Sequence, residues 1–95
     1  MGRGVGPDAY RRRMGITLFT TRVHLSTRVA TAADLFAVPG IDLWVVDYTV
    51  VQKGRESRYT APCVAEAAAR RMVENLLADR VPGLDVTDIY SEEVD

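Results

Sequence analysis

The run from Ile41 to Gln52, IDLWVVDYTVVQ, constrains the fold more than any other segment. Its β-branched and aromatic residues are typical of strands. Turn signals bound it on both sides, Pro39-Gly40 before it and Lys53-Gly54 after it. The sequence therefore predicts one long strand, which at roughly 3.3 Å per residue would extend about 40 Å, beyond the usual strand length.

Alternation along this strand sorts its side chains onto two faces. One face carries the large residues Trp44, Val46, Tyr48 and Val50. The opposite face is apolar as far as Val45 and polar from Asp47 onward. We therefore expect the first half of the strand to be buried on both sides.

Apolar periodicity and turn signals predict five further elements. In chain order they are a strand over 16–27, a short helix over 31–37, a strand over 57–61, a long helix over 62–79 and a strand over 84–90. Thr31 is a suitable cap for the short helix, and Pro39-Gly40 stops it. The turn Lys53-Gly54-Arg55-Glu56 is expected to join the second and third strands as a hairpin.

This order predicts an α+β fold, a four-stranded sheet with one long and one short helix in the ferredoxin-like βαββαβ order. The first crossover is its weak point, because residues 28–38 barely reach the 10–12 or so residues that a parallel connection requires. The alternative is a three-stranded antiparallel meander followed by the long helix and the last strand.

Charge and composition divide the chain into three expected parts. Residues 1–15 hold four of the seven glycines and the triplet Arg11, Arg12 and Arg13 without regular periodicity, which indicates a flexible basic arm. Residues 16–90 are expected to form the single domain, and residues 91–95 an acidic tail. The first thirty residues have a net charge of +5 and the remaining sixty-five a net charge of −6, giving −1 overall.

Several classes of protein are disfavoured. No apolar run approaches the roughly 20 residues that span a bilayer, and no export signal is recognisable, so a cytoplasmic protein is expected. One cysteine, Cys63, and one histidine, His24, provide neither an internal disulfide nor a zinc ligand set. No motif for a metal or a cofactor is present, and neither is expected.

No catalytic residue is assigned. Cys63 is expected in the first turn of the long helix, but free cysteines are mostly small buried hydrophobes. Asp42 and Asp47 lie five apart on a strand and point to opposite faces, which excludes paired acid–base chemistry. The sequence thus favours a non-catalytic protein over an enzyme.

Nucleic-acid binding is an alternative that the sequence does not favour. Arg11, Arg12 and Arg13 could neutralise phosphates, and a sheet can be an RNA platform. However, the segment KGRESRY at 53–59 has arginine and serine where the RNA-binding signature requires aromatic residues, and the net charge is negative.

The interpretation we favour is a small binding or assembly module that forms a homodimer through its sheet. Two helices shelter one sheet face, so apolar residues of the long strand are expected to remain exposed and to mark a partner surface. The interface candidates are Trp44, Val46, Tyr48 and Val50. A further alternative is a small-molecule enzyme with a pocket at the dimer interface, near Tyr48, His24 or Arg58.

Overall fold

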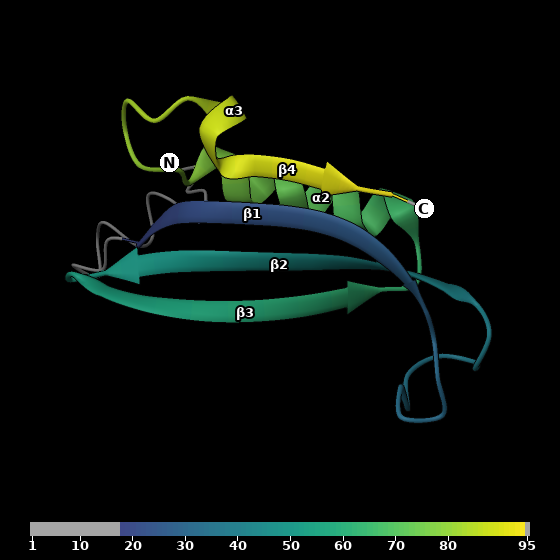
Figure 1. Ribbon diagram of the computed structural model, residues 1–95. Helices are drawn as coiled ribbons and strands as arrows, with labels where there is room; N and C mark the ends of the chain where they lie inside the picture. Colours follow the sequence, from purple (N-terminus) through teal and green to yellow (C-terminus); the bar gives the residue numbers. More distant parts are fainter. Residues whose placement is uncertain (1–17, 95) are drawn as a thin grey trace, which may run out of the picture.

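The computed structural model describes residues 18–94. It is an α+β fold with a four-stranded mixed sheet and two helices (Figure 1). The elements, in chain order, are β1 (Leu18–Val29), β2 (Asp42–Gln52), β3 (Arg55–Cys63), α2 (Glu66–Ala78), α3 (Val86–Ile89) and β4 (Tyr90–Glu93).

The strands lie in the order β3-β2-β1-β4. β1 pairs antiparallel with β2, and β2 antiparallel with β3, whereas β4 joins β1 in parallel. The element order is therefore β-β-β-α-α-β and not the ferredoxin-like βαββαβ order. The alternative, an antiparallel meander followed by helix and strand, describes the sheet correctly.

The short helix expected over 31–37 is absent, and this segment forms turns instead. The Asp34 carboxylate accepts the backbone N–H of Thr31 at 2.8 Å and pairs with Arg28 at 2.9 Å. Such local side-chain bonds offer the backbone an alternative to helix. Backbone bonds from Ala30 to the Ile41 carbonyl and from Gly40 to the Ala30 carbonyl then close the loop, so the chain reverses direction.

The hairpin between β2 and β3 is tighter than expected. Its two central residues, Lys53 and Gly54, have φ values of 53° and 75°. Positive φ at both positions indicates a type I′ turn, whose twist matches that of the flanking strands. β3 consequently extends from Arg55 to Cys63, and α2 begins at Glu66.

α2 covers one face of the sheet and buries the main core against it (Figure 1). The buried members of this cluster are Val23, Leu25, Val46, Ala69 and Val73. The two helical residues lie four apart on the predicted apolar stripe, as an amphipathic helix requires. The helix thus fixes which sheet face is covered.

A smaller cluster lies on the opposite face of the sheet. Leu43 and Val45 of β2 are buried there with Ala30, and Ala37 of the connecting loop packs against them. The first half of β2 is therefore buried on both sides, as expected, because the loop covers what α2 does not.

The first and the last strand differ from those expected from the sequence. A bulge between Thr20 and Arg22 shifts the alternation at the start of β1. The last strand begins only at Tyr90, because residues 86–89 form α3, whose N-terminus is capped by Asp85 through the Thr87 N–H at 3.0 Å. Residues 91–93, expected in the acidic tail, belong to β4.

Candidate functional site

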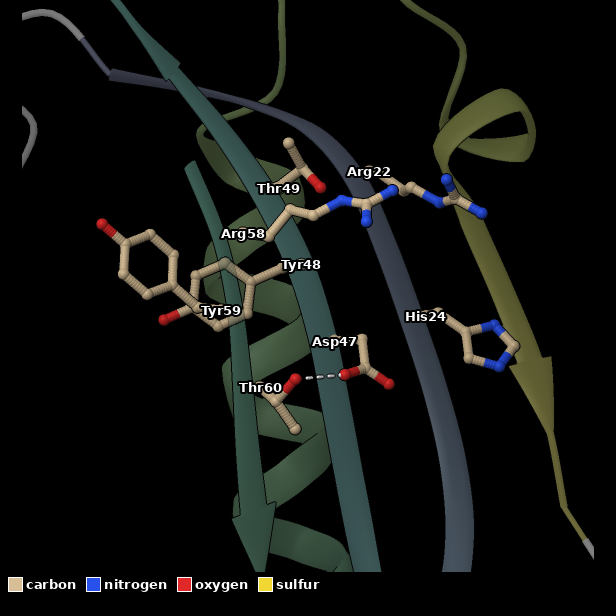
Figure 2. A pocket seen from close by; sticks show the side chains of 8 residues that line it. All are labelled: Arg22, His24, Asp47, Tyr48, Thr49, Arg58, Tyr59 and Thr60. Carbon is tan, nitrogen blue, oxygen red and sulfur yellow. Dashed lines mark hydrogen bonds between the residues drawn. The ribbon is translucent and has the colours of Figure 1, made fainter. Parts of the chain in front are cut away.

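A hollow of about 310 Å³ lies on the open face of the sheet, the face that α2 leaves uncovered. Figure 2 shows its lining, which β1, β2 and β3 provide. The lining residues are Arg22, His24, Asp47, Tyr48, Thr49, Arg58, Tyr59 and Thr60. Most of them are polar or charged, in contrast to the core on the other face.

Two arginines flank the upper row of the hollow. Thr49 is the cross-strand partner of Arg22 on β1 and of Arg58 on β3, so all three share one row across the sheet. Thr49 is only 6% exposed. In Figure 2 the Arg58 side chain extends across β2 toward β1, so two cationic side chains from the strands on either side of β2 lie in one row of the sheet.

The arginines of this row differ from Arg28, Arg70 and Arg80, which have partners within the fold. Arg28 and Arg70 pair with carboxylates, and Arg80 donates to backbone carbonyls. Within residues 18–94, Arg22 and Arg58 make no hydrogen bond or ion pair. Their donors are available to a ligand.

A second row, two residues along each strand, places His24, Asp47 and Thr60 side by side. The Thr60 hydroxyl donates to Asp47 Oδ1 at 2.5 Å. His24 reaches the other way, with Nδ1 2.6 Å from Ser91 Oγ and Nε2 3.3 Å from Glu93 Oε1. Asp47 is therefore the carboxylate within the hollow, next to the arginine row.

The predicted interface residues lie on the side of β2 that faces α2, although Tyr48, which stacks on Tyr59, also borders the hollow. Trp44, Val46 and Tyr48 pack in or against the core under α2, with Val46 fully buried, and Val50 is half-buried. The expected apolar outward face is not found: the loop covers its apolar end, and its centre is polar. Self-association through the sheet stays a prediction.

Other residues singled out in the sequence have different settings from those expected. Cys63 is half-buried in β3 and not in the first turn of α2, because the strand continues past Pro62. Arg11, Arg12 and Arg13 lie outside the described residues. The described part of the chain holds no group of three or more His, Cys, Asp or Glu side chains placed to bind a metal ion.

The sequence did not predict that Arg22 and Arg58 share one row of the sheet. Alternation alone could place Arg22 and His24 on one face of β1. Their proximity to Arg58 depends on the antiparallel register of three strands, which a parallel β1–β2 crossover would have changed.

Comparisons of the chain with protein-family models, with curated proteins and with solved structures found no match. Within residues 18–94, no helix has both the length and the apolar character needed to cross a bilayer. The site must therefore be interpreted from its own chemistry.

Proposed function

We propose that this protein is a small binding and assembly module that works as a homodimer, with two copies joined along β3. The observation that carries the proposal is the free edge of this strand. Among the described elements, β3 pairs only with β2, which leaves a nine-residue strand at the edge of the sheet. Such an edge is a template for pairing with another chain.

The hairpin geometry fixes which backbone groups face outward. In a two-residue hairpin the flanking pair, here Gln52 and Arg55, exchanges both hydrogen bonds, and bonded pairs then alternate along the ladder. The N–H and C=O groups of Glu56, Arg58 and Thr60 therefore point away from β2. Pro62 occupies the next outward position, where its missing N–H costs no bond to β2.

Charge selects one register for a two-fold antiparallel pair. With Ser57 on the axis, Glu56 of each copy lies opposite Arg58 of the other. A pair centred on Arg58 would bring two arginines together, and one centred on Tyr59 would set Glu56 against Pro62, which has no donor. Opposite charges across strands contribute roughly 0.2–1 kcal/mol per pair, whereas like charges destabilise.

The edge also has an apolar component. Tyr59 is 49% exposed and stacks on its cross-strand partner Tyr48, with ring centroids 5.3 Å apart. In the Ser57-centred register Tyr59 lies opposite Arg55 of the second copy, a suitable cation–π pair. An interface of one strand pair is small, so a weak, concentration-dependent dimer is expected.

Sedimentation equilibrium between about 10 μM and 1 mM tests the proposal. Wild-type protein should shift from monomer toward dimer mass across this range. Glu56→Arg and Arg58→Glu should each weaken association, and the double variant should restore it because the charges again complement each other. Glu74→Arg, on the exposed face of α2, is the matched control. Monomer mass throughout, or a dimer indifferent to the single and double exchanges, would reject pairing along β3.

A further inference from the structure

We infer that the hollow on the open sheet face binds a small organic anion, with a phosphate or carboxylate group held by Arg22 and Arg58. This inference goes beyond the dimer; it shares Arg58 with the proposed dimer edge, so its test uses variants that leave Arg58 in place. It rests on the row in which these two arginines flank Thr49, and on the absence of a carboxylate partner for either within residues 18–94.

The two guanidinium groups are suited to this ligand chemistry. Arginine presents planar, always-charged donors that match the oxygens of carboxylates and phosphates, often in pairs. The two like charges lie in one row of the sheet on either side of β2, where they repel each other, and a bound anion would relieve that repulsion. The hollow, at about 310 Å³, is within the range of small-molecule sites.

The position of Asp47 restricts the class of ligand further. Its Oδ1 accepts the Thr60 hydroxyl, and this leaves acceptor capacity on the carboxylate facing the hollow (Figure 2). The Asp47 row lies two residues from the arginine row, roughly 7 Å along the strands. A ligand that carries an ammonium or hydroxyl donor a short chain away from its anionic group would satisfy both rows.

The surrounding charge favours a small anion over a polyanion. Asp47 lies inside the hollow, Glu93 borders it through His24, and Glu56 is exposed on β3. Residues 31–95 have a net charge of −6. A nucleic-acid strand crossing this face would bring phosphates close to these carboxylates, whereas a single anionic group contacts only the arginine row.

The first experiment titrates ¹⁵N-labelled full-length protein with inorganic phosphate and with phosphoethanolamine, following backbone amide shifts. Shifts should concentrate at the strand positions around Arg22, Thr49 and Arg58. Arg22→Gln should weaken binding of both probes about tenfold or more, the loss expected for a charge-assisted bond. Arg71→Gln, an exposed arginine on α2, is the matched control and should bind normally.

Asp47→Asn tests the second row, since asparagine can still accept the Thr60 hydroxyl. It should raise the affinity for inorganic phosphate, because a repelling charge is removed, and reduce the preference for phosphoethanolamine over phosphate. No saturable shift up to about 50 mM of either probe, or equal losses in Arg22→Gln and Arg71→Gln, would overturn the anion site. An unchanged preference in Asp47→Asn would overturn the role given to Asp47.

A further titration uses a short single-stranded DNA at low and at high salt and tests whether this face binds nucleic acid. We expect it to bind this face more weakly than phosphoethanolamine does. Tighter, strongly salt-dependent binding that perturbs the same amides would overturn the small-anion assignment in favour of nucleic acid. Glu56→Arg alters the dimer edge and leaves Arg22 and Arg58 in place, so failure of dimerisation and failure of anion binding are separable.

Discussion

The guanidinium of Arg70 lies over the ring of Trp44, with its central carbon 5.9 Å from the ring centroid. Trp44 packs against the main core below. Trp44→Ala should therefore lower the free energy of unfolding by about 3 kcal/mol, the low end for truncating a large aromatic residue, because the ring is only partly buried. Urea unfolding measures the loss. Trp44→Phe is the control and should lose less; a cost below about 0.5 kcal/mol for the alanine variant would contradict this packing.

Arg70 also ties β4 to α2. It bonds Glu66 at 2.9 Å and Glu92 at 2.6 Å, and its bonds, followed by that of Tyr90, hold the pKa of Glu92 below its usual value. A depressed folded-state pKa stabilises the fold above the unfolded pKa, near 4.3, and this contribution is lost as pH falls through the folded pKa. We expect Glu92→Gln to melt below wild type at pH 6, with the gap closing toward pH 3. A gap that does not change with pH would contradict the ion pair.

The strands were largely predictable, since alternation and turn signals are local. The segment 31–37 was not, because Thr31 and Asp34 favour a helix start by composition yet form a closed turn with Arg28. Because this segment forms a turn and not a crossover helix, β2 runs antiparallel to β1, whereas a crossover would have made the two strands parallel. Similarly, Pro62 is a good first-turn residue for a helix, but the hairpin register carries β3 past it.

The candidate site followed from register and could not be predicted from spacing along the chain. Arg22 lies on β1 and Arg58 on β3, far apart in the sequence. Thr49 of β2 lies between them in one row only because the three strands form an antiparallel meander. Tyr48, His24 and Arg58, suggested from the sequence as neighbours of a pocket, do line the hollow. On the large face of β2, Val46 is in the main core with Trp44 and Tyr48 packed against it, and the role of this face as an interface stays a prediction.

The type I′ turn gives a prediction about backbone conformation. Gly54 has a φ of 75°, and a Cβ built there meets nothing within 4 Å. Gly54→Ala should therefore cost about 1–2 kcal/mol through the left-handed conformation alone, without a clash. Lys53→Asn should stabilise, because asparagine tolerates its φ of 53°. Thermal unfolding should show a lower melting temperature than wild type for Gly54→Ala and a higher one for Lys53→Asn. Equal melting temperatures would argue against the type I′ turn.

Thr20 is 1% exposed, and its hydroxyl has no hydrogen-bond partner among the described residues. A buried unpaired polar group costs about 1–3 kcal/mol. Thr20→Val, which keeps the shape, should therefore raise the free energy of unfolding by about 1 kcal/mol in chemical denaturation. Thr21→Val is the control: the Thr21 hydroxyl donates to the Thr49 carbonyl, so its removal should give no gain. A destabilised Thr20→Val would mean that the hydroxyl is satisfied.

Asp34 should control the order of the loop over 30–41. The Arg28 guanidinium and the Thr31 N–H hold the pKa of Asp34 well below its usual range. The stabilisation is thus present above the unfolded pKa, near 3.9, and is lost as pH falls through the folded pKa. Asp34→Asn should lower the hydrogen-exchange protection of the Ala30 and Gly40 amides at pH 6, since their bonds close this loop.

Asp42 is the matched control for this loop, because it lies at its exposed end in the pairing with Val29. Asp42→Asn should leave the protection of both amides unchanged. If Asp34→Asn also leaves them unchanged, the loop is held by its backbone bonds and by Ala37 on Leu43 and Val45. In that case the ion pair with Arg28 would not explain why the predicted helix is absent.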